Sequence, residues 1–209
     1  ATASGAITAG KPIIVNTNGS VSEVGISFTQ LGSNVYADGD TDSNATDDDP
    51  LVLYSETSNK FYHIWKNSSY VNIRVATLTG TTWAWPGSTQ SPHSGGSGEF
   101  ACGIGQDINK MLFLYNDNSN TRSLVRVTSP NGNAVSFGTA VEVTPDLISH
   151  CMVTYHKDSK FIVAYRDAGS PYALQVRIAT VSGTSVSLGS EVTIYNSNHF
   201  LLLIYFNIR

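Results

Sequence analysis

The sequence predicts an all-β fold of repeated four-stranded units, and three observations lead to this prediction. The chain of 209 residues contains 26 Ser, 20 Thr, 16 Asn and 18 Gly, but only 5 Glu, 6 Lys, 4 Gln and 2 Met. Strong helix formers other than Ala and Leu are therefore scarce, whereas residues typical of strands and turns are abundant. Short apolar runs alternate with turn signals, and a set of landmark residues recurs with a period of about fifty residues.

Three kinds of landmark define the repeat. A lysine opens an apolar segment in three places, at Lys60, Lys110 and Lys160. An arginine lies six residues before a turn glycine in the pairs Arg74–Gly80, Arg126–Gly132 and Arg177–Gly183. A further glycine recurs at Gly32, Gly87, Gly138 and Gly189, with spacings of 55, 51 and 51 residues. Because these landmarks keep one order and one period, the repeat defines the architecture of the chain.

The third complete copy shows most clearly how a unit is divided into strands. Strands are expected over residues 149–156, 160–167, 172–181 and 184–194, separated by turn signals. Within the second of these, Phe161, Val163 and Tyr165 fall on one face, as the two-residue period of a strand requires. Four short strands in about fifty residues, repeated in tandem, are typical of a β-propeller blade. A β-solenoid is the alternative, and the hairpin turns argue against it.

Complete units are expected over about residues 49–90, 99–143 and 149–194. Residues 20–37 resemble the closing strands of an earlier unit, and residues 199–209 the opening strand of another. Joined together, these partial units would form a split fourth blade and close a small ring. Alternatively, the chain belongs to a longer array, or several copies complete the ring. Residues 1–19 stand apart as an N-terminal β arm with a hairpin turn signal at its end.

The best copy of the repeat is marked by three segments in a fixed order. It contains Tyr165-Arg166-Asp167, then Arg177-Ile178-Ala179-Thr180-Val181, then Ser182-Gly183-Thr184-Ser185-Val186-Ser187-Leu188-Gly189-Ser190. This pattern is similar to the repeats of about fifty residues in tail-fibre and structural proteins of marine bacteriophages. The resemblance is closest over residues 164–192 and extends loosely over residues 20–209. It implies a virion or adhesin context more than any particular chemistry.

Composition and charge exclude several classes of function. The net charge is −4 with 13% charged residues, and no basic face suggests nucleic-acid binding. No apolar run reaches the roughly 18 residues of a membrane span, so membrane insertion is not expected. The two cysteines, Cys102 and Cys151, are expected to be small buried residues. Low charge and many Ser, Thr and Asn residues favour an extracellular or virion location.

An acidic stretch from residue 38 to residue 49 contains six of the 16 acidic residues. Carboxylates at alternate positions of a turning loop can converge on one hard cation. Positions 1, 3, 5, 7 and 12 of a calcium-binding loop correspond here to Asp38, Asp40, Asp42, Asn44 and Asp49. The expected glycine at position 6 is Ser43, and the last residue is a short Asp where Glu is usual. The prediction is a Ca²⁺ site, with a solvated acidic loop as the alternative.

A triplet of an aromatic residue and two polar residues recurs at one strand end of each unit. The three triplets are Trp65-Lys66-Asn67, Tyr115-Asn116-Asp117 and Tyr165-Arg166-Asp167. An aromatic ring beside planar polar groups suits sugar recognition. The predicted ligand-binding residues are therefore Trp65, Tyr115, Asp117, Tyr165, Arg166 and Asp167. The alternative is that the ring packs between blades while the Asp or Asn caps the turn.

Trp83 and Trp85 lie beside an irregular stretch, residues 86–98, that also contains His93. Two tryptophans near a loop are predicted to form a binding platform, and core packing is the alternative. Catalysis is not expected, because no pair of carboxylates can be assigned and no nucleophile elbow or phosphate-binding loop is present in the sequence.

The sequence therefore predicts a non-enzymatic virion structural or receptor-binding protein, similar to an adhesin or tail fibre, that binds cell-surface glycans multivalently. Its expected partners are further copies of the chain or other virion proteins. The alternatives are a propeller-type glycoside hydrolase and a purely architectural filament or decoration subunit.

Overall fold

The computed structural model describes residues 13–23, 48–66, 70–80, 82–93, 95, 98–169 and 172–195. The chain divides into two compact units, residues 1–34 and 35–209. In the first unit, β1 (Ile13–Val15) and β2 (Val21–Glu23) form an antiparallel hairpin. The chain turns between Asn16 and Ser20, with Gly19 in the left-handed region at φ 78°.

The described residues of the second unit form three antiparallel sheets. The first sheet has the order β3 (Asp48–Ser55), β4 (Lys60–Lys66), β5 (Val71–Thr79), β6 (Thr82–Ala84). The second is built from β7 (Phe100–Gly105), β8 (Lys110–Asp117), β9 (Arg122–Asn131), β10 (Ala134–Phe137) and β11 (Val141–Thr144). The third is built from β12 (Ile148–Lys157), β13 (Lys160–Asp167), β14 (Leu174–Ser182), β15 (Ser185–Leu188) and β16 (Val192–Tyr195).

The described residues contain strands and turns and no helix, which confirms the all-β prediction. It follows that this part of the chain offers no helix of the length and apolarity needed to cross a membrane. The partial units expected at residues 20–37 and 199–209 lie outside the described residues, apart from residues 20–23 of the hairpin.

The fourth strand of each unit is interrupted, which differs from the single strand expected over residues 184–194. β10 and β11 both pair with β9, and β15 and β16 both pair with β14. In the first sheet, β6 is followed by an isolated bridge between Ile73 and Gln90. The recurring glycines at positions 87, 138 and 189 lie at these interruptions.

The arginine and glycine landmarks are the two ends of one interaction. Arg126 donates through Nε and Nη2 to the carbonyl oxygen of Gly138, at 3.0 and 2.6 Å. Arg74 Nε donates to Gly87 O at 2.9 Å, and Arg177 Nε donates to Gly189 O at 3.0 Å. Each guanidinium therefore holds a backbone carbonyl at the point where the fourth strand is interrupted.

The remaining landmarks belong to the turns of the hairpins. Gly80, Gly132 and Gly183, at the turns between the third and fourth strands, have φ values of 60°, 62° and 60°. Asn59, Asn109 and Ser159 precede the landmark lysines at φ 50°, 48° and 60°. Glycine and asparagine tolerate this left-handed backbone better than most residues, so the repeated turn signals reflect backbone geometry.

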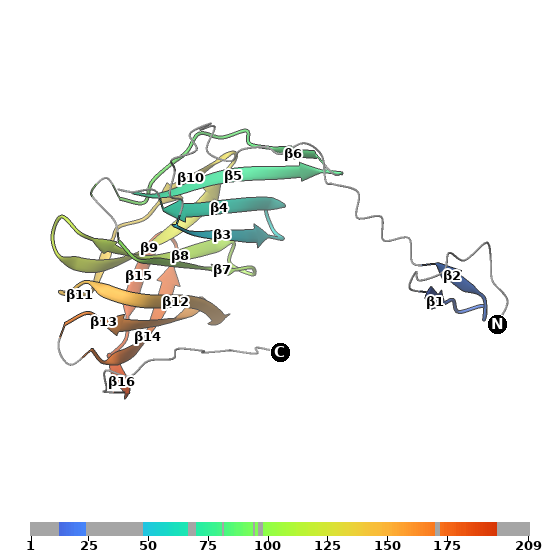
Figure 1. The fold of residues 1–209 in the computed structure, drawn as a ribbon. Helices are drawn as coiled ribbons and strands as arrows, with labels where there is room; N and C mark the ends of the chain where they lie inside the picture. Colours follow the sequence, from blue (N-terminus) through green and yellow to red (C-terminus); the bar gives the residue numbers. More distant parts are fainter. Residues whose placement is uncertain are drawn as a thin grey trace. The chain divides into compact units, whose positions relative to one another are not determined.

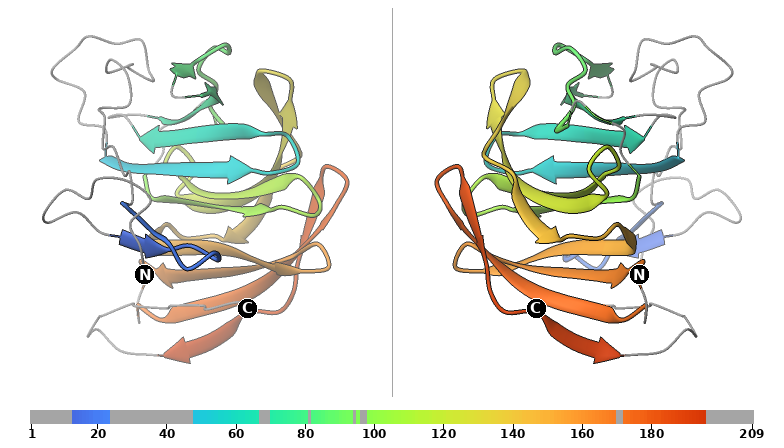
Figure 2. Two further views of the ribbon diagram at one scale, coloured as in Figure 1. Left: turned by 90° about the vertical axis from the view of Figure 1, so that its right-hand side faces the viewer. Right: turned by 90° about the vertical axis from the view of Figure 1, so that its left-hand side faces the viewer.

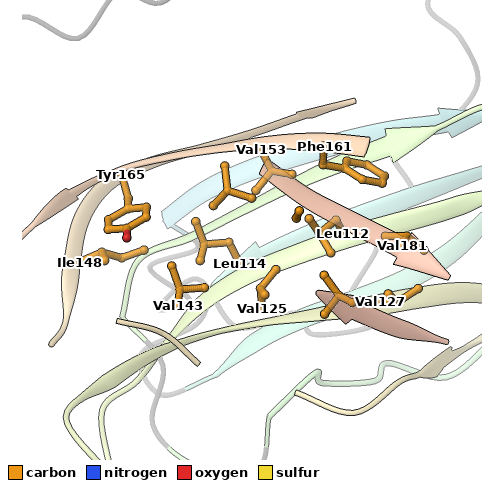
Figure 3. Close-up of a cluster of buried hydrophobic side chains, with 13 residues drawn as sticks. Leu112, Leu114, Val125, Val127, Val143, Ile148, Val153, Phe161, Tyr165 and Val181 are labelled. Carbon is orange, nitrogen blue, oxygen red and sulfur yellow. The ribbon is translucent and has the colours of Figure 1, made fainter. Parts of the chain in front are cut away.

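The three sheets stack in chain order, with the second between the other two (Figures 1 and 2). We call the face of a sheet that points toward the preceding sheet its front, and the other face its back. The front of the first sheet is the face that points away from the second sheet. Met111, Phe113 and Tyr115 on the front of the second sheet pack against Tyr62 and Ile64 of the first. On the back of the second sheet, Leu112, Leu114, Val125 and Val127 pack against the front of the third, which supplies Phe161, Val163 and Tyr165 (Figure 3).

The same arginines and glycines also join one sheet to the next. Arg126 donates through Nη1 to Pro92 O, and Arg177 donates through Nη1 to Val143 O at 2.6 Å. A Cβ atom at Gly87 would overlap the carbonyl oxygen of Asn133, which follows the turn glycine of the second sheet. A Cβ atom at Gly138 would likewise overlap Thr184 O of the third sheet. These two positions need glycine because the turn of the following sheet approaches so closely.

Replacing Arg126 with lysine tests this arrangement. Lysine keeps the charge but lacks the planar fork, so the carbonyls of Gly138 and Pro92 lose donors, at a cost of about 1–3 kcal/mol. We expect a lower urea midpoint of unfolding with an unchanged slope. The exposed Lys157 changed to alanine serves as the control, with a midpoint close to that of the wild type. Equal midpoints for all three proteins would contradict a stabilising role of the arginine.

Candidate functional site

The second strand of each unit ends in one of the predicted triplets. β8 ends at Asp117 and β13 ends at Asp167, whereas β4 ends at Lys66. Asn67, the last residue of the first triplet, lies outside the described residues. The structure shows that equivalent strand ends carry quite different environments.

At the end of β8, Asp117 is buried in a network of donors. Its Oδ2 accepts hydrogen bonds from Asn120 Nδ2 at 2.8 Å and Arg122 Nε at 3.2 Å. Its Oδ1 accepts from Asn120 N at 3.3 Å and lies 3.1 Å from His93 Nε2. The carboxylate caps its own turn and is closed off by the loop from the first sheet that contains His93.

This environment changes the pKa of Asp117. Burial alone would raise the pKa of the carboxyl group. The hydrogen bonds from Asn120 and Arg122, together with the nearby His93, outweigh burial and lower the pKa below its usual value. The group is therefore a buried structural carboxylate that the fold keeps ionised.

The other two residues of this triplet are also internal. Tyr115 is buried, and its ring stacks on His93 with 5.5 Å between ring centroids. Asn116 donates from Nδ2 to Ile148 O at 2.8 Å and accepts from Ile148 N at 3.0 Å, which ties β8 to the start of β12. The triplet of the second sheet thus packs between sheets, leaving no open ring face for a sugar.

At the end of β13, the tyrosine is internal but its neighbours are not. Tyr165 is fully buried, and its hydroxyl donates to a carboxylate oxygen of Glu191. Burial raises the pKa of Tyr165, and the carboxylate of Glu191 raises it further. Arg166 and Asp167, which follow it, are both only partly buried.

An open cluster forms here around a residue that the triplet does not include. Tyr172 is 40% exposed, and the guanidinium carbon of Arg166 lies 4.9 Å from its ring centroid. Its backbone has φ 60°, and its N–H donates to Gly169 O at 2.7 Å. Asp167 Oδ1 accepts from Gly169 N at 2.8 Å. We call Arg166, Asp167 and Tyr172 the Tyr172 cluster.

The repeat contains a signal for Tyr172 that the predicted triplets did not use. It lies 51 residues after Thr121, which has φ 52° at the same point of the second sheet. A bulky aromatic residue at positive φ is rare and is often found at a functional site. The repeat register therefore marks Tyr172 as an unusual occupant of a turn position.

The three predicted tryptophans gather on the front of the first sheet and are not part of the Tyr172 cluster. Trp83 and Trp85 stack with 6.3 Å between ring centroids, and both are partly buried. Trp65 is buried and stacks on His63 at 4.7 Å. His63 also contacts Trp85 at 5.9 Å, so these rings form one aromatic face.

The predicted calcium ligands cannot be placed as a set. Asp38, Asp40, Asp42 and Asn44 lie outside the described residues, as does the side chain of Asp49, whose backbone belongs to β3. Within the described ranges, no group of three or more His, Cys, Asp or Glu side chains could hold a metal ion. Cys102 and Cys151 are both free thiols, and burial raises the pKa of Cys102.

The chain has a distant similarity to known structures. No family model and no curated protein matches the chain. Among solved structures, the chain is similar to an α-L-arabinofuranosidase from Podospora anserina in complex with cellotriose, with 14% identity and a TM-score of 0.44. The match covers 71% of this chain and 50% of the enzyme, so the chain spans about half of its length.

The pKa of Asp117 predicts how stability depends on pH. In the unfolded chain this carboxyl group has its ordinary pKa of 3.8, and in the folded chain its pKa is lower. Its contribution to stability is therefore present above the unfolded pKa and is lost as the pH falls through the folded pKa. We expect the free energy of unfolding of Asp117→Asn to fall less steeply with acid than that of the wild type.

Urea denaturation at a series of acidic pH values measures this difference. Asp158→Asn is a matched control, because Asp158 is an exposed turn residue at φ 51°, a conformation that asparagine adopts readily. The control should follow the wild-type curve. An Asp117→Asn curve parallel to both would contradict the lowered pKa of Asp117 in the folded chain.

Proposed function

We propose that this protein is a non-enzymatic glycan-binding domain of a virion or extracellular structural protein, and that the Tyr172 cluster is one of its sugar sites. The observation that carries the proposal is the exposed ring of Tyr172, which is held at positive φ with the guanidinium carbon of Arg166 4.9 Å from its ring centroid. The low charge of the chain and the phage-like repeat over residues 164–192 support the proposed setting.

The chemistry of the cluster suits a neutral sugar. The C–H face of a pyranose ring stacks on an aromatic ring, while its hydroxyl groups need both donors and acceptors. Arg166 supplies donors beside the ring, and Asp167 supplies acceptor oxygens, of which one is held by Gly169 N. Because the turn positions these groups before a ligand arrives, little side-chain freedom is lost on binding.

We further propose that the three sheets are blades of a propeller-like array. Each is an antiparallel meander of four strands in chain order, with the fourth strand interrupted, and successive sheets stack front to back. Hairpin-connected strands of this kind favour a blade over the coils of a β-solenoid. The array would present equivalent turns, at Thr121 and Tyr172, on successive blades.

Single sites of this kind bind sugars weakly, so the proposed mechanism depends on several copies acting together. Further copies of the chain or other proteins of the same assembly are the proposed partners. Cell-surface glycans are the proposed ligands.

Replacement of Tyr172 by alanine should weaken glycan binding. Loss of the stacking surface is expected to cost about 1–2 kcal/mol, a decrease in affinity of about 5- to 30-fold. A glycan array identifies the sugars, and calorimetry with a soluble oligosaccharide measures the monovalent affinity. The control is Tyr54→Ala, which removes a tyrosine of similar exposure that bonds Asn59 in the turn between β3 and β4. Equal losses in both variants would overturn the assignment of the site.

The absence of catalysis is tested on the same glycans. We expect no release of reducing sugar after long incubation of the full chain with any glycan that the array identifies. Turnover would overturn the non-enzymatic proposal in favour of a glycoside hydrolase. Folded protein with no affinity for any glycan would favour a purely architectural subunit.

A further inference from the structure

Equivalent positions on the backs of the second and third sheets differ sharply in exposure. Val127 on β9 is 0% exposed, whereas Ile178, its equivalent 51 residues later on β14, is 41% exposed. Val143 on β11 is 3% exposed, and its equivalent on β16, Ile194, is 59% exposed. The strand pairing is the same in both sheets, so the difference arises because the third sheet covers the back of the second.

The front of the first sheet shows the matching difference. Val52, Cys102 and Val153 occupy one position of the first strand, because each pairs with the same residue of the second strand, at His63, Phe113 and Val163. Cys102 and Val153 are 6% and 7% exposed, but Val52 is 57% exposed. Over residues 98–144, which the structure describes completely, the second sheet exposes no large hydrophobic side chain.

Gly189 has the same role in its strand as Gly87 and Gly138, but a different environment. Its N–H donates to Ile178 O at 2.8 Å and its carbonyl accepts from Arg177, as in the second sheet. A Cβ atom at Gly87 or Gly138 would overlap the turn of the following sheet. Among the described residues, only Ile178 would lie within 4 Å of a Cβ at Gly189. Gly189 of the third sheet therefore occupies the position that contacts a turn in the other two sheets, but no turn among the described residues contacts it.

The carbonyl groups that accept from the following arginine form a series with the same spacing. Arg126 bonds Pro92 O, and Arg177 bonds Val143 O. Ile194 is the next member of this series, 51 residues after Val143, and it lies on the exposed back of the third sheet. Arg74 is the corresponding arginine on the front of the first sheet.

We propose that the back of the third sheet binds the front of the first sheet of a second copy of this chain, so that copies associate head to tail. The chain carries both halves of the interface that it already uses twice internally, so a second copy is complementary to it. The turn between β5 and β6 of the second copy, which contains Gly80, would rest on Gly189.

This association leaves the ring of Tyr172 at the surface. Arg166 is the equivalent of Asn116, which bonds Ile148 of the following sheet, so Arg166 would lie at the edge of the new interface. Thr121 is the equivalent of Tyr172 in the second sheet, and it is exposed although the third sheet covers the back of that sheet. Head-to-tail association therefore brings several sugar sites into one particle. It does not depend on sugar binding, and either proposal can fail alone.

The test uses the full chain, whose monomer mass is 22.4 kDa, with light scattering after size exclusion at increasing concentrations. We expect the wild-type mass to rise in multiples of the monomer mass. Gly189→Ala should weaken association at least about tenfold, because the added methyl group meets the turn of the second copy. It should leave the melting temperature of the monomer unchanged, whereas Gly138→Ala should lower it, because the methyl group there meets Thr184 within the chain.

Two charged variants test the direction of association. Ile178→Asp blocks the back of the third sheet, and Val52→Asp blocks the front of the first. Both side chains are exposed in the single chain, so both variants should fold. Each alone should remain monomeric, and an equimolar mixture should form a dimer and nothing larger, because each copy retains one competent face.

Three results would overturn the proposal. The first is a wild-type protein that stays at the monomer mass at every concentration. The second is a Gly189→Ala monomer with a lowered melting temperature, which would show that residues of the same chain pack against Gly189. The third is a Val52→Asp variant that still dimerises while Ile178→Asp does not, which would indicate pairing of two back faces.

Discussion

The structure depends on one contact, in which an arginine of the third strand binds the carbonyl of a glycine in the interrupted fourth strand. The guanidinium has donors to spare, and in Arg126 and Arg177 it also reaches a carbonyl of the preceding sheet. The glycine has no side chain, so the turn of the following sheet can lie against it. One residue pair therefore fixes the interruption of a strand, the stacking of a sheet on the one before it, and the position where the turn of the next sheet packs.

Much of this fold was predictable, because it rests on local signals. Composition and strand periodicity were sufficient for the all-β class, and the turn glycines and asparagines mark backbone positions that few other residues adopt. The interruption of the fourth strand was not predictable. An alternating apolar pattern continues across Gly189, and the division of the strand there is shown by the separate pairing of β15 and β16 with β14 and by the contact with Arg177. The spacing of landmarks thus revealed that a repeat exists, but not that two of its landmarks touch.

The candidate site was predictable only as a position along the strand. The triplets of the second and third sheets end at equivalent points, yet Asp117 is enclosed by donors from Asn120 and Arg122, whereas Asp167 is only partly buried and accepts a hydrogen bond from Gly169 N. The difference comes from residues outside the triplets. Arg122 and the loop containing His93 close the second site, and Tyr172 opens the third. A triplet in the sequence cannot reveal which neighbours surround it, because those neighbours come from other strands and another sheet.

Stacking front to back has a consequence for how such a protein can work. An interface between unlike faces always leaves one face of each kind at the ends, and Val52 and Ile194 mark these two ends in this chain. Such an interface produces a closed ring when the rotation between units closes, and an open array when it does not. In both cases the turns that carry Thr121 and Tyr172 stay at the rim, because the contacts lie on the sheet faces. Growth through the faces would therefore multiply the exposed turns at the rim, and the weak sugar binding proposed for Tyr172 would then add up over several copies.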